Sequence, residues 1–221
     1  MENIISMVDH TILKPEAKKE EIEVLCQEAI EYKFAAVCIN PYYVSLCKDL
    51  LKDTDVKVAT VIGFPLGANT SEVKAFETED AIKNGANEID MVINIGALKD
   101  KDYKTVKEDI EKVVKVAHAH EGVIVKVIIE TALLEKEEKI KACELSMDAK
   151  ADFVKTSTGF STAGATVEDI ELMKSVVGDH LEIKASGGVR DVESARAMIE
   201  KGATRLGTSS GVKIAKELLG R

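Results

Sequence analysis

The sequence predicts an α/β fold, a closed (β/α)8 barrel formed by residues 1–221 as a single domain. Eight short runs rich in Val and Ile alternate with stretches of helical spacing. The runs are apolar almost throughout, as parallel strands buried on both faces are. Eight such units are the number that closes this barrel, also known as the TIM barrel.

The eight expected strands are 8–13, 35–40, 57–63, 88–94, 123–130, 152–158, 181–186 and 205–209. Helical spacing is clear between several of them. In segment 102–119, Val106, Ile110 and Val113 fall on one stripe. Segment 193–200 is followed by Gly202, as expected near a helix end, and 212–219 follows the last strand.

An open doubly wound sheet is the competing architecture. Such a sheet usually has fewer strands and carries a GxGxxG fingerprint after the first one. Here the first strand is followed by Lys14, Pro15 and Glu16, without that glycine pattern. The closed barrel is therefore favoured.

Composition narrows the class of function. The 221 residues carry 30 Lys and Arg against 39 Asp and Glu, a net charge of −9. We therefore expect neither nucleic acid nor a membrane as partner, because both favour a positive surface. The chain opens without a signal-peptide pattern, and its cysteines form no CxxC motif, so we expect reduced thiols in a cytoplasmic protein. These cysteines are Cys26, Cys38, Cys47 and Cys143.

Two lysines within consecutive expected strands are the strongest functional signal. Lys155 and Lys184 lie in apolar surroundings, where desolvation disfavours the charged amine. Adjacent strands are about 4.8 Å apart, and like charges at about 5 Å repel by roughly 3 kcal/mol. That repulsion would bring one lysine pKa down to about 8, making a usable nucleophile. Asp90 is the expected counter-charge and proton carrier. A single lysine at a strand end more often extends its amine to solvent than acts in catalysis, so the pairing of the two carries the prediction.

Glycines and serines follow the last strands. In (β/α)8 barrels, phosphate is often held by the loops after strands 7 and 8 and by a helix N-terminus. Gly187 and Gly188 follow the seventh strand, and Ser209 and Ser210 precede the last helix. Gly159, after the sixth strand, is expected to add to the same phosphate-binding site. A Ser-Ser-Gly segment alone is more often an ordinary helix cap, but the combined positions favour a phosphate site.

Other charged residues receive supporting roles. We expect Asp9 to partner Lys184, and Lys126 to add charge without acting as the nucleophile. His10 is expected to hydrogen bond to a neighbouring carboxylate, while His118 and His120 face different directions at a helix end. No dense cluster of His, Cys and Asp suggests a metal.

Five segments together resemble the deoxyribose-phosphate aldolase family over nearly the whole chain. They are 9–11 (DHT), 88–94 (EIDMVIN), 153–160 (FVKTSTGF), 183–190 (IKASGGVR) and 207–211 (GTSSG). The resemblance implies a class I aldolase without metal or cofactor, which reversibly cleaves 2-deoxy-D-ribose 5-phosphate to acetaldehyde and D-glyceraldehyde 3-phosphate. It also implies that Lys155 forms the Schiff base, Lys184 depresses its pKa, and Asp90 works with Lys184 in proton transfer. The phosphate-binding positions it implies are Gly159, Gly187, Gly188, Ser209 and Ser210.

The chain departs from some relatives at its C-terminus, where 216–221 (KELLGR) contains no tyrosine that could assist a proton step. Two alternatives stay open. One is another lysine-dependent sugar-phosphate lyase, such as a transaldolase-like or keto-acid aldolase. The other is a catalytically silent barrel that only binds a sugar phosphate. Relatives often self-associate, so a homo-oligomer, dimer or tetramer, is also considered.

Overall fold

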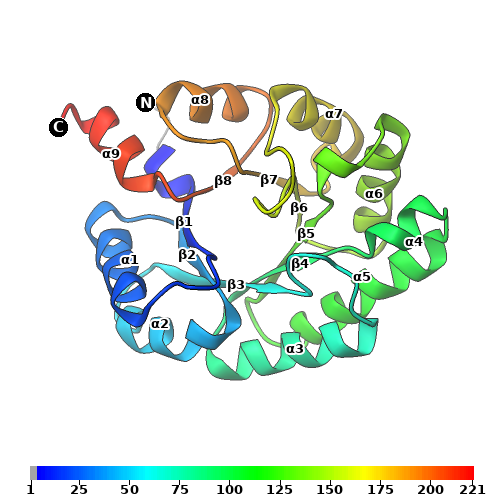
Figure 1. The fold of residues 1–221 in the computed structure, drawn as a ribbon, viewed down its shortest axis with the longest axis horizontal. Coiled ribbons are helices and arrows are strands. Elements are labelled where there is room, and N and C mark those ends of the chain that lie inside the picture. The colour runs from blue at the N-terminus through cyan, green and yellow to red at the C-terminus, as the bar shows by residue number, and fades with distance from the viewer. Residues whose placement is uncertain (1–3) are drawn as a thin grey trace.

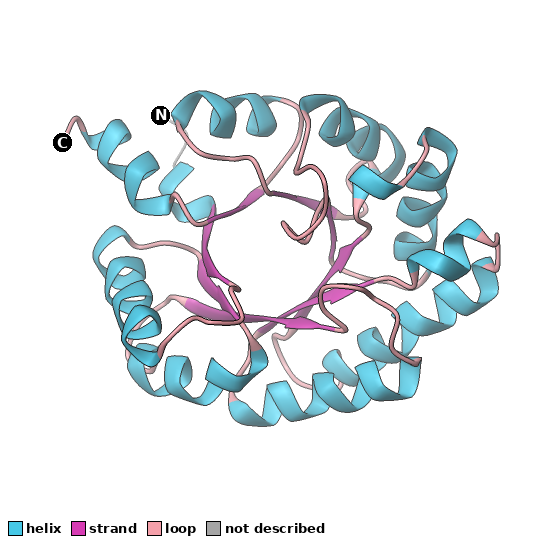
Figure 2. Cartoon of the chain, viewed as in Figure 1, coloured by secondary structure: helices cyan, strands magenta, loops and turns pink. Residues whose placement is uncertain are grey.

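The computed structural model describes residues 4–221, and it shows a closed ring of eight parallel strands surrounded by helices (Figures 1 and 2). The strands follow chain order, and the eighth pairs with the first. The predicted (β/α)8 barrel is confirmed. The strands are β1 (Val8–Ile12), β2 (Ala36–Ile39), β3 (Lys57–Ile62), β4 (Glu88–Val92), β5 (Ile124–Ile128), β6 (Phe153–Lys155), β7 (Glu182–Ser186) and β8 (Arg205–Thr208).

The helices cover the outside of the ring. They are α1 (Lys19–Tyr32), α2 (Val44–Leu51), α3 (Ser71–Asn84), α4 (Ile95–Lys99), α5 (Tyr103–Ala117), α6 (Lys136–Asp148), α7 (Val167–Val177), α8 (Val192–Glu200) and α9 (Gly211–Leu219), with short 3-10 turns η1 (Ile4–Met7), η2 (Pro41–Tyr43) and η3 (Thr131–Leu133). The expected helix at 102–119 corresponds to α5. Asp102 begins it by accepting a hydrogen bond from the Thr105 N–H, which satisfies one of the free donors of the first turn. No helix within residues 4–221 is both long enough and apolar enough to cross a membrane.

Alternation along the strands separates two environments. In β4, Ile89 and Met91 belong to the large apolar core between strands and helices, whereas Glu88 and Asp90 point to the other face, inside the ring. One side of the interior is lined by apolar side chains. There a smaller cluster fills the ring beside β1 to β3; its members are Leu13, Ala36, Cys38, Ala59 and Val61. Charged side chains occupy much of the remaining interior, where the centroid of the Phe153 ring lies 5.9 Å from the Lys126 amine.

The sixth strand is shorter than expected. The sequence predicts it at 152–158, but the strand ends at Lys155. The Thr156 N–H still donates to the Lys184 carbonyl, whereas the Thr158 N–H turns to the carboxylate of Glu130. This side chain draws the backbone out of the ladder, so the segment after Lys155 forms a loop.

Candidate active site

Three strands bring the predicted lysines and aspartate together inside the ring. Lys155 on β6 and Lys184 on β7 are direct partners in the strand register, so they lie at the same height. Both amines donate to the same oxygen, Oδ2 of Asp90 on β4, at 2.8 Å and 2.7 Å respectively. Lys184 also donates to Asp9 on β1. All four side chains are buried.

A second set of ion pairs lies next to this group. The amine of Lys126 donates to Oδ1 of Asp90 at 2.8 Å and to Glu88 at 2.5 Å. The Arg205 guanidinium, from β8, donates to Asp9 at 2.7 Å and to Glu88 at 3.0 Å. These bonds join strands β1, β4, β5 and β8 across the barrel interior. Each carboxylate is therefore held in place by at least two cations.

The charge balance of this interior network depends on Lys155. Among residues 4–221, four cations and three carboxylates take part: Lys126, Lys155, Lys184 and Arg205, with Asp9, Glu88 and Asp90. Fully ionised, the buried network carries one excess positive charge, which is costly away from water. With Lys155 as a neutral amine, the charges balance. Lys155 pairs with one carboxylate, Asp90, whereas Lys126 and Lys184 each pair with at least two, so the charge of Lys155 is the least compensated of the three. The geometry therefore favours the uncharged form of this one lysine.

The pKa shifts also favour a neutral Lys155 beside a charged Lys184. Burial first, and then the nearby Lys184 charge, lower the pKa of Lys155, although Asp90 opposes both effects. Burial alone would lower the pKa of Lys184 as well, but Asp9 and Asp90 outweigh burial and raise it. The pKa of Asp90 lies well below its usual value, because Lys126, Lys155 and Lys184 together overcome its desolvation. Two neighbouring amines with pKa values shifted in opposite directions are typical of acid–base sites.

The glycines expected to bind phosphate meet above this network. Gly187 and Gly188 follow β7 with φ of 76° and 84°, and Gly159 follows β6 with φ of 85°. A Cβ built on Gly187 would lie 3.9 Å from the Gly159 Cα, so the two turns are side by side. Neither Gly187 nor Gly188 donates its N–H to an acceptor within residues 4–221. These turns present free donors and no side chains.

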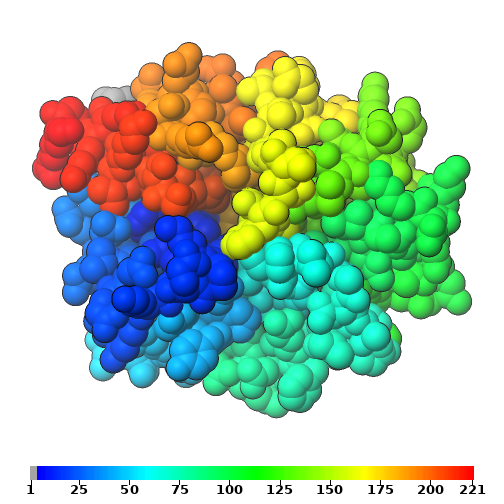
Figure 3. Space-filling model, viewed as in Figure 1, coloured from blue at the N-terminus to red at the C-terminus, as the bar shows by residue number. Residues whose placement is uncertain are grey.

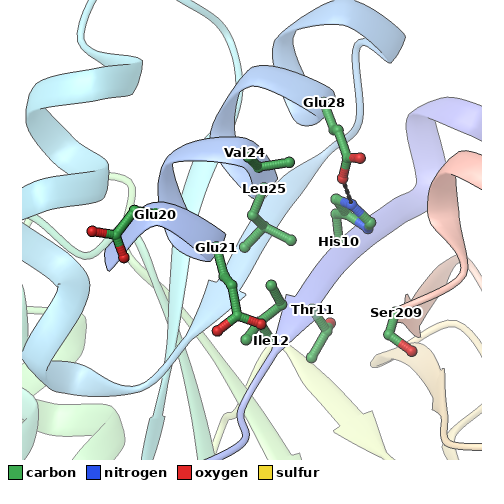
Figure 4. Close-up of a pocket in the computed structure, with 9 residues that line it drawn as sticks. All are labelled: His10, Thr11, Ile12, Glu20, Glu21, Val24, Leu25, Glu28 and Ser209. Carbon is green, nitrogen blue, oxygen red and sulfur yellow. Dashed lines mark hydrogen bonds and ion pairs between the residues drawn. The ribbon is translucent and has the colours of Figure 1, made fainter. Parts of the chain in front are cut away.

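The serines after β8 lie at the same end of the barrel. Ser209 is exposed, and the N–H of Ser210 donates to the Thr208 hydroxyl at 2.9 Å. Ser209 borders a pocket of about 390 Å³ between β1 and α1, shown in Figure 4. His10, which also lines this pocket, bonds to Glu28 at 2.7 Å. The carboxylate partner of His10 is Glu28 because Asp9 points into the barrel instead.

Several members of the network were not anticipated from sequence. Glu88 and Arg205 are charged residues inside expected strands, and Glu88 is two residues before Asp90, which places it on the same face. That two-residue spacing in the sequence could have predicted that Glu88 lies inside the barrel with Asp90. Glu130 was not anticipated either, although it closes the expected fifth strand; its buried carboxylate accepts from the Thr158 N–H and hydroxyl. Within the described residues, no group of His, Cys, Asp or Glu is arranged to hold a metal.

A closed barrel with an amine of lowered pKa and glycine turns at the same end defines a class of barrel enzymes that act on carbonyl compounds. The model of the DeoC/LacD family aldolases matches residues 3–217, and the chain belongs to this family.

Named relatives match nearly the whole chain. The deoxyribose-phosphate aldolase of Clostridium tetani is 62% identical over 214 residues, covering 97% of this chain and 98% of the relative. That of Thermococcus gammatolerans is 64% identical over 214 residues, covering 96% and 95%. Among solved structures, the tetrameric deoxyribose phosphate aldolase from Aeropyrum pernix superposes with a TM-score of 0.91 at 33% identity, covering 98% of this chain and 91% of that one. The predicted family is confirmed.

Proposed function

We propose that this protein is a class I aldolase that reversibly cleaves 2-deoxy-D-ribose 5-phosphate to acetaldehyde and D-glyceraldehyde 3-phosphate. The observation that carries the proposal is the shared bonding of Lys155 and Lys184 to one oxygen of Asp90, with the pKa of Lys155 lowered. The names of relatives at 62% and 64% identity support the substrate.

In this proposal the neutral amine of Lys155 attacks the C1 aldehyde of the open-chain sugar phosphate. Loss of water from the resulting carbinolamine leaves an iminium ion, which withdraws electrons from the carbon chain. The C2–C3 bond then breaks as a base takes the C3 hydroxyl proton, and D-glyceraldehyde 3-phosphate departs. The C2 carbon of the enamine takes up a proton, and water releases acetaldehyde from Lys155.

Asp90 and Lys184 are the proton carriers in this scheme. Their contact at 2.7 Å gives a proton a direct path between the two side chains. Asp9 accepts a hydrogen bond from Lys184, and Lys126 donates one to Asp90. These contacts support a positioning role for Asp9 and Lys126. A network already oriented in the ground state loses little energy to reorganisation during the reaction.

The phosphate is assigned to the turns above the lysines. Free N–H groups at Gly187 and Gly188 can approach an anion closely because no side chain intervenes. We assign the whole clamp to the backbone and hydroxyl donors at the exits of β6, β7 and β8, namely Gly159, Gly187, Gly188, Ser209 and Ser210. Fixing the phosphate would orient C1 toward the Lys155 amine.

Borohydride trapping tests the proposed function. Acetaldehyde and sodium borohydride should convert Lys155 to a stable N-ethyl lysine, identified by peptide mass. Lys155→Met should abolish the adduct, whereas the surface variant Lys201→Met, which loses only its pair with Glu171, should retain it. A barrel that only binds sugar phosphates would form no adduct. A substrate panel then decides the reaction: cleavage of fructose 6-phosphate or of a keto-deoxy sugar acid, without cleavage of deoxyribose 5-phosphate, would overturn the assignment.

We further propose that the protein is a cytoplasmic homo-oligomer. The tetramer of the Aeropyrum pernix relative supports self-association, and four unpaired cysteines support a reducing compartment. Size-exclusion chromatography with light scattering tests the first point; a monomer mass at micromolar concentration would refute it.

A further inference from the structure

A loop lies across the open end of the barrel, here called the mouth loop and comprising residues 159–165. Figure 1 shows this yellow segment reaching over the ring of strands, and Figure 3 shows it extending to the middle of that face. Both of its ends are attached. Just before it, Thr158 donates to the Glu130 carboxylate; at its last residue, the Ala165 N–H donates to the Gly187 carbonyl at 2.9 Å.

The first part of the mouth loop makes an aromatic contact with the opposite side of the barrel, through Phe160. The ring of Phe160 meets the ring of Phe64 edge to face, with centroids 5.3 Å apart at 86°. Phe64 follows β3 and packs on the apolar cluster inside the ring. Because β3 and β6 are three strands apart in a ring of eight, this pair spans the mouth.

The reacting groups lie beneath this contact and are closed off from solvent. Only 3% of the surface of Lys155 is exposed, and Lys184 and Asp90 are fully buried. Little of Lys155 is open to an incoming aldehyde, so access to its amine depends on the groups above it. The mouth loop is the segment suited to move, because between its attached ends most of its residues are exposed and a Cβ added at Gly159 would touch nothing within 4 Å.

We propose that Phe160 and Phe64 form an aromatic gate that limits the size of the aldehyde reaching Lys155. The inference rests on the proposed function and adds a specificity determinant to it. An edge-to-face pair shifts an equilibrium by a factor of only about 2 to 12, so the gate opens thermally. A two-carbon aldehyde needs a small opening, whereas a branched or aromatic aldehyde needs the two rings to separate.

Trapping kinetics with two aldehydes test the gate. In each reaction the amine and the aldehyde lose water to form an imine, and hydride from borohydride reduces the C=N bond to a secondary amine. The initial rate of adduct formation on Lys155 is measured with acetaldehyde and with phenylacetaldehyde. The variant-to-wild-type rate ratio for each aldehyde cancels its intrinsic reactivity.

Phe160→Ala should raise the initial rate of phenylacetaldehyde trapping by about 2- to 12-fold, the factor that corresponds to the energy of the lost aromatic pair. It should change the rate of acetaldehyde trapping less than about twofold. Phe76→Ala is the matched control, because Phe76 is 76% exposed on α3 and, within residues 4–221, its ring pairs with neither Phe64 nor Phe160; both rates should stay unchanged. Phe64→Ala should reproduce the selectivity of Phe160→Ala, and the double variant should add little, because either truncation already opens the pair.

Two failures are distinguishable. If wild-type Lys155 forms an adduct with acetaldehyde but Phe160→Ala leaves the selectivity unchanged, the gate is refuted and the proposed function stands. If the two single variants have effects that multiply in the double variant, the rings act separately and the gate is again refuted. If wild-type Lys155 forms no acetaldehyde adduct, the proposed function fails, and the gate fails with it.

Discussion

Replacing Lys184 with methionine removes one of the three lysine amines that donate to Asp90. The interior then holds Lys126, Lys155 and Arg205 against three carboxylates. Charge balance in the wild type requires Lys155 to be neutral, whereas balance in this variant requires it to be protonated. The substitution should therefore raise the pKa of Lys155.

The size of the shift follows from the geometry. Amines at 2.8 Å and 2.7 Å from the same oxygen are at most about 5.5 Å apart, and like charges at that distance repel by about 3 kcal/mol at an effective dielectric of about 20. This energy corresponds to about two pKa units. Nucleophilic attack needs the neutral amine, so activity rises as pH passes upward through the pKa of Lys155. We expect the acid limb of the profile to move about two units toward alkaline pH.

The assay is the pH dependence of kcat/KM for cleavage of deoxyribose 5-phosphate, together with the pH dependence of acetaldehyde trapping. Trapping isolates attack by Lys155 from later proton transfers. Lys74→Met is the matched control, because Lys74 is also fully buried and paired, with Asp109 at 2.5 Å, but lies outside the barrel interior. A folded Lys184→Met protein whose trapping profile keeps the wild-type midpoint would refute the electrostatic reasoning.

Three further predictions concern Asp90 and Gly187. Asp90→Asn removes the negative charge that three lysines contact and replaces one acceptor oxygen with an N–H donor, so the free energy of unfolding in urea should fall by about 3–5 kcal/mol; a loss below about 1 kcal/mol would contradict the network. The lowered pKa of Asp90 gives stability that is full above about pH 4 and is lost as pH falls, so the same variant should flatten the decline between about pH 5 and 2. Gly187→Ala places a Cβ at φ of 76°, 3.0 Å from the Gly164 Cα. It should raise KM for deoxyribose 5-phosphate but not for deoxyribose, and an equal rise for both sugars would contradict the phosphate assignment.

Much of the site was predictable because strand alternation assigns faces. Lys155, Lys184 and Asp90 are charged residues in otherwise apolar runs, so a use inside the barrel was a sound hypothesis from sequence. The expected phosphate glycines likewise lie at the exits of neighbouring strands. The same alternation could have identified Glu88, two residues before Asp90, as a further interior acid.

The sequence by itself determined the number of strands, their order of alternation with helices, and which residues face inward. Only the tertiary structure decided which inward residues share a level, because the stagger between strands arises when the ring closes. Arg205 reaches Asp9 across 196 residues of chain, a contact that no local pattern contains. The tertiary structure also decided where β6 ends and that Phe160 contacts Phe64, since both depend on side chains that are distant in sequence.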